Sequence, residues 1–411
     1  MKTLEFTAEE LCLEPRLRIA LVTETYPPEV NGVAMTLQRM VDGLLRRGHR
    51  VQLIRPRQAG SDIAQRDGDY EEMLSRGWKL PRYDGLRFGL PAKSALVRAW
   101  GRQRPDLVHV ATEGPLGWTA ISAAKKLRLP VTSDFHTNFD HYSEHYGVGW
   151  LRQPVAAYLR RFHNRTASTF VPTAEMARAL RALGYAQVEV VSRGVDTRLF
   201  SPTRRSVALR AEWGVGDDGL ALISVGRLAP EKNLQLVMRA YAAVREARPS
   251  ARLVVVGDGP MRDALARECP DAVLCGMRTG EDLAAHYASA DLFLFPSLTE
   301  TFGNVTLEAM ASGVCAVAYD YAAAAEVLRD LENGLSVPCR DEAAFIERAV
   351  RGACDDGLRR RLAERARASA ELIDWERVND HFAGALVRVW RGTDNPAAGL
   401  GAERTLGWER R

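Results

Sequence analysis

Two successive series of short apolar runs, each alternating with stretches of helical periodicity, most constrain what this chain can fold into. The runs are bounded by turn residues, as buried strands are, and strands that alternate with helices form parallel sheets covered by helices on both faces. The sequence therefore predicts an α/β fold with two doubly wound, Rossmann-like domains that face a central cleft. The expected strands are Leu17–Val22, Val51–Ile54, Leu107–Val110, Val131–Phe135, Thr169–Val171, Val188–Val191, Ala221–Val225, Leu253–Val256, Ala272–Leu274, Leu292–Phe295, Cys315–Ala318 and Leu335–Val337.

The length of the chain fits two domains. It has 411 residues, and two domains of roughly 180 residues each are the ordinary solution for such a length. We expect an N-terminal domain over residues 1–195, with residues 1–16 loose, and a C-terminal domain over residues 196–374. A last helix over residues 375–392 then precedes a flexible tail at residues 393–411. The expected helices are Val33–Leu45, Leu116–Leu127, Leu151–Arg165, Ala174–Leu183, Asn233–Ala247 and Trp375–Trp390, and residues 57–85, rich in charges and glycine, are expected to be irregular.

Composition and charge narrow the class of protein. The net charge of +4 is too small an excess to indicate nucleic-acid binding. No charge-free apolar run approaches the ~20 residues of a membrane span, and residues 1–15 carry four glutamates without an apolar core, so we expect no signal peptide. The six cysteines form no Cys-x-x-Cys pair, which predicts reduced thiols rather than disulfides or a zinc knuckle. We expect a cytoplasmic protein, with peripheral association with the inner face of the cytoplasmic membrane left open.

The segment from Asp291 to Glu308 reads as a strand, a polar loop and the start of a helix. Free N–H groups of residues 302–304 would lie at the carboxyl edge of the sheet, where open α/β folds bind ligands. Glu300 and Glu308 frame these donors. Because carboxylate–hydroxyl bonds are charge-assisted, this arrangement suits a ligand with many hydroxyls. The spacing alone is equally compatible with a surface loop that carries two solvated glutamates.

A second motif, Gly-Arg-x4-Lys at residues 226–232, also follows a buried strand and opens a helix. Arg227 and Lys232 could both reach a diphosphate at the start of that helix. Two solvated cations beside a turn are the alternative for this motif taken by itself. Together with Glu300 and Glu308, the motif favours a diphosphate-bearing ligand.

These motifs resemble those of the retaining GT-B glycosyltransferases of the family-four type, and the resemblance covers roughly residues 17–392. It implies that Arg227 and Lys232 neutralise the departing nucleoside diphosphate, so that neither a metal nor a cofactor is needed. Glu300 would bind hydroxyls of the donor sugar, and His136 would lie near that sugar. It also implies that the last helix crosses back onto the first domain and that no protein nucleophile is required. Donor-binding positions would be Gly32, Met277, Arg278, Phe302, Gly303, Asn304, Val305 and Glu308, of which Glu308 holds the ribose.

Within that family, residues 134–146 and 319–323 look most like those of GDP-mannose-dependent α-mannosyltransferases. They are also similar to those of sulfoquinovosyl-diacylglycerol synthases, which use a UDP-sugar. The resemblance implies hexose transfer from a nucleotide sugar to an acceptor hydroxyl, with a lipid acceptor open. A sugar-nucleotide epimerase and a non-catalytic sugar-binding relative are the alternatives from other classes. The base, the sugar, the acceptor, the oligomeric state and the role of Asn31 stay open.

Several other motifs are given other interpretations. The turn Gly257–Arg262 matches only half of a dinucleotide fingerprint, which argues against nicotinamide or flavin. His141–His145 matches a His-x-x-Glu-His zinc motif, but it lacks an identifiable third ligand. Asp67-Gly68-Asp69 is expected to be a solvated turn rather than a metal site. The helix Leu151–Arg165 pairs an apolar stripe with arginines, which fits either a core-facing helix or one resting on an anionic membrane surface.

Overall fold

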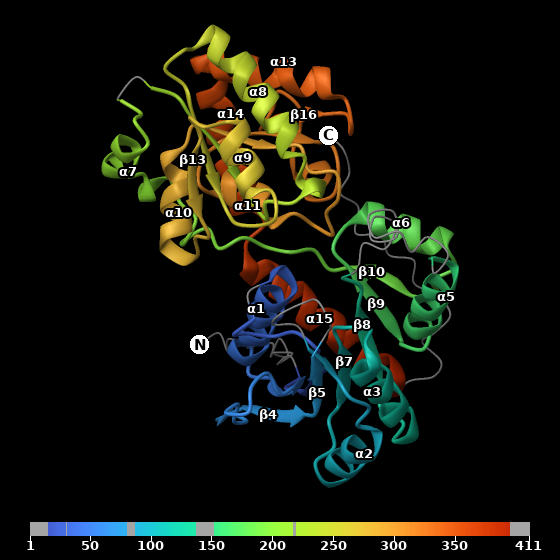
Figure 1. Cartoon of the computed structure of the whole chain (residues 1–411). Coiled ribbons are helices and arrows are strands. Elements are labelled where there is room, and N and C mark those ends of the chain that lie inside the picture. The colour runs from blue at the N-terminus through green and yellow to red at the C-terminus, as the bar shows by residue number, and fades with distance from the viewer. Residues whose placement is uncertain (1–14, 30, 80–86, 137–151, 217–218, 395–411) are drawn as a thin grey trace, which may run out of the picture. The chain divides into compact units, whose positions relative to one another are not determined.

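The computed structural model describes residues 15–29, 31–79, 87–136, 152–216 and 219–394 (Figure 1). The zinc-like motif at residues 137–151, most of the expected loose start and nearly all of the expected tail lie outside these residues. The chain divides into two compact units. Unit 1 holds the residues up to Asp134, Phe162–Thr169 and the residues from Phe382 on, and unit 2 holds Phe135–Arg161 and Phe170–His381.

The strands form two larger sheets and one hairpin. The order of the first sheet is β10-β9-β8-β7-β1-β2-β4-β3, and the order of the second is β13-β12-β11-β14-β15-β16. The strands of the first sheet are β1 (Arg18–Val22), β2 (Arg50–Pro56), β3 (Arg66–Asp67), β4 (Tyr70–Ser75), β7 (Leu107–Val110), β8 (Val131–Asp134), β9 (Ser168–Val171) and β10 (Val188–Val190), and the hairpin is β5 (Gly77–Lys79) with β6 (Arg87–Gly89). Those of the second are β11 (Ala221–Val225), β12 (Arg252–Val256), β13 (Val273–Gly276), β14 (Leu292–Phe295), β15 (Cys315–Tyr319) and β16 (Leu335–Val337).

Helices follow most of the strands, as the alternating pattern predicts. In the first half of the chain they are α1 (Gly32–Arg46), α2 (Lys93–Arg102), α3 (Pro115–Lys126), α5 (Arg152–His163) and α6 (Ala174–Ala182). The others are η2 (Pro202–Arg204), α7 (Val207–Glu212), η3 (Pro230–Lys232), α8 (Leu234–Ala247), α9 (Arg262–Glu268), α10 (Gly280–Ser289), α11 (Asn304–Ala311), α12 (Ala323–Val327), α13 (Glu342–Cys354), α14 (Asp356–Glu371) and α15 (Trp375–Asp394).

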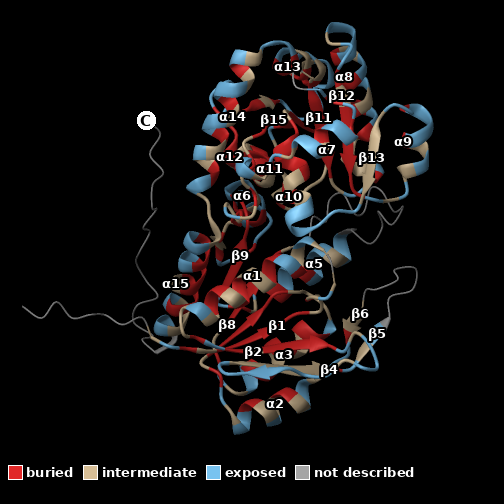
Figure 2. Ribbon diagram, turned by 90° about the vertical axis from the view of Figure 1, so that its left-hand side faces the viewer, coloured by how far each residue is buried: buried red, intermediate tan, exposed pale blue. Residues whose placement is uncertain are grey.

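The second sheet is buried on both faces. In β14, Phe293 and Phe295 belong to one apolar cluster, whereas Leu292 and Leu294 belong to the other. Successive side chains of a strand point to opposite faces, so each face of the sheet has its own core. All pairs in this sheet are parallel. Figure 2 shows these strands buried between helices whose outer faces are exposed. The predicted α/β fold of two Rossmann-like domains is confirmed.

One expectation about the first sheet is wrong. Residues 57–85 are not irregular throughout, because β4 pairs in parallel with β2, β3 pairs with β4, and β5 lies in the same stretch. All but the last residue of β4 are only partly buried. A strand near the edge of a sheet does not need a continuous apolar run. The charges of its sequence, Tyr-Glu-Glu-Met-Leu-Ser, therefore concealed it.

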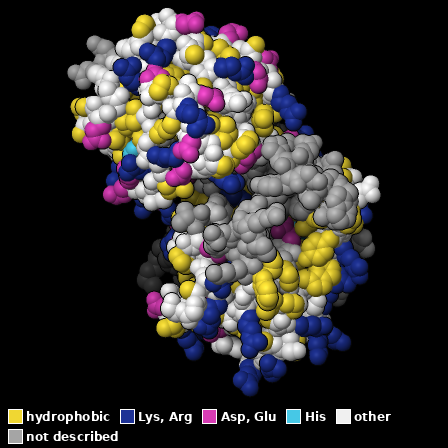
Figure 3. Space-filling model, viewed as in Figure 1, with side chains coloured by type: hydrophobic (Ala, Val, Ile, Leu, Met, Phe, Trp, Pro, Cys, Tyr) yellow, Lys and Arg dark blue, Asp and Glu magenta, His cyan; other side chains and the backbone are white. Residues whose placement is uncertain are grey.

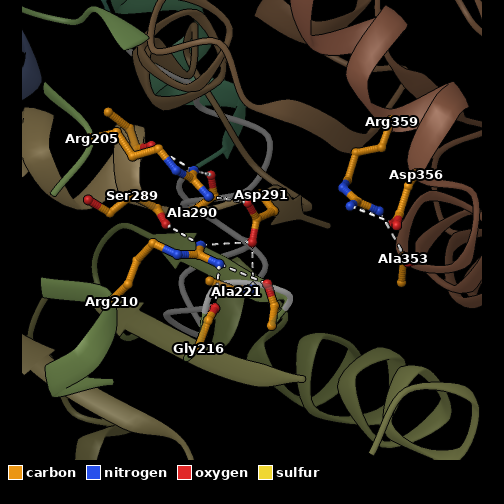
Figure 4. Close-up of polar contacts among 12 residues, drawn as sticks. Arg205, Arg210, Gly216, Ala221, Ser289, Ala290, Asp291, Ala353, Asp356 and Arg359 are labelled. Atoms are coloured by element: carbon orange, nitrogen blue, oxygen red, sulfur yellow. Dashed lines mark hydrogen bonds and ion pairs between the residues drawn. The ribbon is translucent and has the colours of Figure 1, made fainter. Parts of the chain in front are cut away.

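Asp291 fixes the amino end of the second sheet (Figure 4). Its Oδ2 accepts from the backbone N–H of Ala221 at 2.8 Å and from Nη1 of Arg210 at 2.9 Å. Its Oδ1 accepts from Nη2 of Arg205 at 2.7 Å. Charge-assisted bonds of this kind are roughly twice as strong as neutral ones. The amino edge of the second sheet is thereby closed by structural contacts.

The basic helix α5 buries part of its apolar stripe. Leu159 and Phe162 are 4% and 0% exposed and pack into the core, whereas Tyr158 is 40% exposed and Arg160 and Arg161 are also exposed. Among the described residues, no helix combines the length and the apolar character that a bilayer span requires. Figure 3 shows Lys and Arg side chains gathered around α2 and α3.

Candidate active site

Two glycine turns pack together at the carboxyl edge of the second sheet. Gly226 follows β11 and Gly257 follows β12, and a Cβ on Gly257 would lie 1.9 Å from the carbonyl oxygen of Gly226. Only glycine fits there. The N–H of Leu228 donates to the carbonyl oxygen of Asp258 at 2.9 Å. The turn that resembles half a dinucleotide fingerprint therefore supports the loop of residues 226–232.

The loop after β14 is held against the same region. The N–H of Leu298 donates to the carbonyl oxygen of Glu231 at 3.0 Å, which ties this loop to η3. The N–H of Ala323 donates to the carbonyl oxygen of Phe302 at 2.7 Å. Gly303, with φ of 91°, precedes α11 in a left-handed conformation that residues with a side chain rarely adopt. Backbone contacts therefore fix both loops.

These contacts bring Lys232 and Glu300 together. Lys232 Nζ lies 2.5 Å from Glu300 Oε1, and the two side chains are only 18% and 15% exposed. Lys232 Nζ also lies 5.9 Å from the ring centre of Phe295. An ion pair that is largely shielded from water is stronger than one on the surface. The two motifs that the sequence singled out separately therefore meet in one place.

Arg227 belongs to the same loop but is more open to solvent. Its side chain is 57% exposed, and Nη1 lies 3.8 Å from Oε1 of Glu231. At that distance and exposure the pair holds the guanidinium loosely. Arg227 can therefore still turn toward an anion.

Glu308 lies inside α11, against α10. The hydroxyl of Tyr287 donates to Glu308 Oε2 at 3.0 Å. Desolvation raises the pKa of Glu308 to about 7, and the hydrogen bond from Tyr287 opposes that rise. Glu308 thus differs from Glu300, which is paired with a cation. The two glutamates of the motif have different environments.

His136 lies beside the Glu300 loop within unit 2. Its Nδ1 lies 2.9 Å from Nη2 of Arg193, and its carbonyl oxygen accepts from Thr301 Oγ1 at 3.0 Å. The buried guanidinium of Arg193 lies 5.8 Å from the ring centre of Phe302. His136 is therefore linked to Phe302 through Arg193 and to the loop that carries Glu300 through Thr301.

Other expected donor-binding residues of unit 2 differ in their exposure. Met277, just after β13, is 63% exposed. Arg278 donates from Nε to the carbonyl oxygen of Cys275 and from Nη1 to Asp282 Oδ2, both at 3.1 Å. At the start of α11, Val305 packs partly against the core. Within the described chain, the buried Oδ1 of Asn304 has no hydrogen-bond partner, so it is available as an acceptor.

In unit 1, Gly32 is the first residue of α1. A Cβ there would meet nothing within 4 Å, so the backbone can be approached closely. Asn31 caps the helix, since its Oδ1 accepts from the N–H groups of Val33 and Ala34 at 3.1 and 2.9 Å. Asn31 therefore has a structural role as the cap of α1.

Three neighbours of the site were given no role from the sequence. They are Tyr287, which contacts Glu308, Arg193, which contacts His136, and Tyr321, whose hydroxyl donates to the carbonyl oxygen of Glu300 at 3.2 Å. Arg193 follows strand β10, so its position at a strand end was the available signal. Tyr321 lies in the segment 319–323 that the sequence singled out, although it was given no role there. Tyr287 carries no such signal, because aromatic residues in an α/β domain are usually core residues.

The Asp67-Gly68-Asp69 motif lies in an exposed turn beside β3. Asp69 Oδ1 accepts from Arg50 Nε at 3.0 Å, with both side chains mostly solvent-exposed. Across the residues that the structure describes, no group of three His, Cys, Asp or Glu side chains could hold a metal ion. The motif is a solvated turn, as expected.

Comparisons with known proteins show which family the chain belongs to. A family model described as Glycosyltransferase Family 4 matches residues 30–199, and another described as Glycosyl transferases group 1 matches residues 219–355. The chain is similar to a GDP-mannose-dependent alpha-mannosyltransferase of Mycolicibacterium smegmatis, with 34% identity over 373 residues that cover 90% of this chain and 96% of that protein. A sulfoquinovosyl transferase of Arabidopsis thaliana is 28% identical over 398 residues, covering 92% of this chain and 75% of that protein.

Among solved structures, the fold is similar to that of a sucrose-phosphate synthase from Thermosynechococcus elongatus. The TM-score is 0.75 at 19% identity, and the match covers 92% of this chain and 100% of the other. Because the identity is low, this similarity shows only that the fold is shared. The similarity to the mannosyltransferase is a similarity of sequence, and it extends over nearly the whole chain. The chain therefore belongs to glycosyltransferase family 4, and it is a nucleotide-sugar-dependent glycosyltransferase with the GT-B fold.

Proposed function

We propose that the chain transfers mannose from GDP-mannose to an acceptor hydroxyl with retention of the anomeric configuration. The observation that carries the proposal is the contact between Lys232 and Glu300, 2.5 Å apart. The ammonium group of Lys232, which can bind a diphosphate, therefore lies beside the carboxylate of Glu300, which can bind sugar hydroxyls. The similarity to the M. smegmatis mannosyltransferase supports GDP-mannose as the donor.

In this proposal the residues after β11 hold the diphosphate. Lys232 and Arg227 contact its oxygens. Negative charge on the β-phosphate grows as the glycosidic bond breaks. A fixed cation there stabilises the transition state more than the ground state, which accelerates the reaction.

The proposed reaction needs no covalent intermediate with the protein. The bond between the anomeric carbon and the β-phosphate oxygen breaks, and the electron pair leaves with GDP. The acceptor oxygen forms a bond to the same face of the anomeric carbon. The acceptor proton moves to a phosphate oxygen of the departing GDP. The products are the mannosylated acceptor and GDP, and the configuration is retained.

The remaining site residues position the donor. Glu300 binds hydroxyls of the sugar, with His136 beside it, and the N–H groups of residues 302–305 face the phosphates and sugar. Glu308 binds the ribose. Met277 and Arg278 lie beside the base. In domain terms, residues 196–374 bind the donor and residues 1–195 carry the acceptor side, and the helix of residues 375–392 returns to the first domain.

The acceptor in this proposal is a lipid hydroxyl at a membrane surface. The exposed Arg160 and Arg161 of α5 offer positive charge for anionic headgroups. Because Leu159 and Phe162 of α5 are buried, this contact would be mainly electrostatic and peripheral.

A UDP-sugar-dependent glycolipid synthase is the alternative, favoured by the similarity to the Arabidopsis sulfoquinovosyl transferase. An epimerase would interconvert nucleotide sugars without using an acceptor. A non-catalytic binding relative would be expected to lack the charged residues Arg227, Lys232, Glu300 and Glu308, all of which are present.

A donor panel tests the proposal. Full-length protein is incubated with GDP-mannose, UDP-glucose or UDP-sulfoquinovose, each with diacylglycerol and phosphatidylinositol vesicles, and nucleoside diphosphate release and glycolipid formation are measured. We expect turnover with GDP-mannose and an α-linked product by NMR. Turnover with a UDP-sugar alone would overturn the choice of donor, and a β-linked product would overturn retention.

A further inference from the structure

The amino edge of the first sheet carries two contiguous hollows within unit 1. Their volumes are about 330 Å³ and 260 Å³, and both are lined by Arg18, Arg50 and Asp69. Arg18 begins β1 and Arg50 begins β2, and the two are register partners. The loop that carries Gly32 lies at the other, carboxyl end of β1. The hollows are therefore separate from the donor-binding position expected at Gly32.

Arginines dominate the charge of these hollows. Like charges at paired positions of neighbouring strands repel each other, so placing Arg18 beside Arg50 costs stability unless negative charge compensates it. Three carboxylates, of Asp69, Glu71 and Asp106, also line the hollows. The five arginines of the lining are Arg16, Arg18, Arg50, Arg66 and Arg104.

The carboxylates are already engaged. Asp106 Oδ2 accepts from the backbone N–H of Arg18 at 2.7 Å. Glu71 Oε1 accepts from Nε2 of Gln52 at 2.7 Å. Asp69 Oδ1 accepts from Arg50 Nε at 3.0 Å in a solvent-exposed pair. Of the five arginines, only Arg50 therefore forms an ion pair with a carboxylate that lines the hollows.

Most of the guanidinium donors remain available. Arg104 Nη2 donates to the carbonyl oxygen of Arg128 at 3.3 Å, a neutral acceptor that does not compensate the charge of the guanidinium. With the amide of Gln103 oriented so that its oxygen faces Arg18, that oxygen accepts from Nη1 and Nη2 at 3.1 and 2.7 Å. Arg16 and Arg66 have no ion pair within the described part of the chain.

We propose that these hollows form a binding site for a small, soluble anion that carries phosphate groups. Guanidinium forks bind phosphate oxygens bidentately, and several of them converge here from separate segments. The volume of the larger hollow falls at the lower end of the range that is usual for ligand pockets. The apolar lining residues Leu17 and Val51 are buried, so the surface offers nothing to lipid chains. A soluble anion therefore fits better than a lipid headgroup.

Calorimetry with inorganic pyrophosphate tests the site. The full chain carrying Lys232→Ala is titrated, because the loop after β11 is itself proposed to bind diphosphate. Against that background, Arg16→Ala with Arg66→Ala is compared with Arg98→Ala with Arg178→Ala. The control pair removes the same charge from exposed arginines outside the hollows. We expect the first pair to weaken pyrophosphate binding about tenfold or more, because it removes two charge-assisted contacts, and the control pair to leave it nearly unchanged.

Three results would overturn the proposal. One is the absence of pyrophosphate binding in the Lys232→Ala background, and another is an equal effect of the two arginine pairs. The third is binding to vesicles of anionic phospholipid without binding to pyrophosphate, which would assign the arginines to a membrane surface instead. Thermal melting of each variant checks that the exposed substitutions leave the fold intact.

Discussion

Lys232 Nζ lies 2.5 Å from Glu300 Oε1, although the two residues are 68 positions apart in the chain. The carboxylate and the ammonium group each fix the other in a partly buried place. A phosphate oxygen that reaches Lys232 would share this cation with Glu300. The position of the diphosphate and that of the sugar are then coupled through one ion pair.

Substitution of Lys232 by alanine should therefore mainly reduce turnover. We expect kcat to fall by about 10²–10³, the order that follows from removal of one preorganised donor at a developing charge. The donor KM should change little, because the charge on the β-phosphate is smaller in the ground state. Steady-state kinetics measure both constants. Glu231→Gln is the control, since the Glu231 carboxylate in the same loop pairs with Arg227, at 3.8 Å, and not with Lys232. Unchanged kcat with a raised KM would show that Lys232 binds both states equally.

Activity should survive an excess of chelator. In the proposed reaction Arg227 and Lys232 supply the positive charge that a divalent ion supplies in other glycosyltransferases. GDP release is measured with and without EDTA. A rate that collapses with EDTA and returns with magnesium or manganese would contradict this prediction. A return with zinc alone would direct attention to His141–His145.

Replacement of Ala322 by glycine should stabilise the protein. Ala322 has φ of 53° and ψ of −127°, a conformation that glycine adopts freely and alanine does not. Strain of this kind costs on the order of 1–3 kcal/mol, and the greater unfolded-state entropy of glycine offsets part of the relief. We expect a net gain of about 1 kcal/mol by denaturant unfolding. Ala325→Gly, inside α12, is the control and should destabilise by roughly 0.5–1 kcal/mol. Equal effects at the two positions would rule out strain at Ala322.

The fold was predictable where burial leaves a simple pattern. Leu107–Val110, Leu292–Phe295 and Leu335–Val337 were expected as strands with the bounds that the structure has. Leu107–Val110 and Leu292–Phe295 lie in the interior of parallel sheets and are buried throughout, whereas Leu335–Val337 is an edge strand whose two apolar residues are buried. Strand β4 was missed because near the edge of the sheet half-exposed polar residues suffice.

The candidate site was predictable as a set of residues but not as a geometry. Glycine turns and charged residues after strands pointed to residues 226–232 and 300–308. The pairing of Lys232 with Glu300 depends on backbone contacts such as that of Leu298 with Glu231, which no local pattern encodes. The contact of Tyr287 with Glu308 likewise depends on how α10 packs against α11.

Charge on α5 should control any binding to anionic vesicles. Arg160 and Arg161 are exposed, whereas the apolar residues Leu159 and Phe162 are buried, so attraction should be electrostatic and should weaken as salt rises. Arg160→Glu with Arg161→Glu should release the protein from vesicles in a flotation assay. Arg98→Glu with Arg102→Glu on α2 is the matched control. If the α5 variant still floats as well as the control, α5 does not contact the membrane.

The stability of the protein should depend on Glu308 in a defined pH window. Desolvation raises its pKa from about 4.5 to about 7, so the folded state holds a proton that the unfolded state has lost between these values. The contribution of this raised pKa to the free energy of unfolding is fully present below pH 4.5 and is lost as pH rises through about 7. Glu308→Gln stays neutral at every pH. It should therefore melt at a higher temperature than the wild type above pH 7, with little difference below pH 4.5. A constant difference across that range would contradict the raised pKa.

The same group should give nucleoside diphosphate binding a pH dependence. The carboxylate is a stronger acceptor for a ribose hydroxyl than the protonated acid, so GDP affinity should rise as pH increases through about 7. Tyr287→Phe removes the bond that lowers this pKa and should move the midpoint to higher pH. Glu308→Gln should weaken GDP binding and flatten the profile.

Glu300 should behave differently, because its proposed partner is the sugar. The sugar ring gains positive charge as the bond to phosphate breaks, and the ribose does not, so a carboxylate on the sugar strengthens its bond in the transition state. Glu300→Gln should therefore lower kcat by roughly 10- to 150-fold, the equivalent of one charge-assisted bond, with little change in donor KM. Calorimetry with GDP and steady-state kinetics separate the two glutamates. If Glu300→Gln weakens GDP and Glu308→Gln does not, the sugar and ribose positions are reversed.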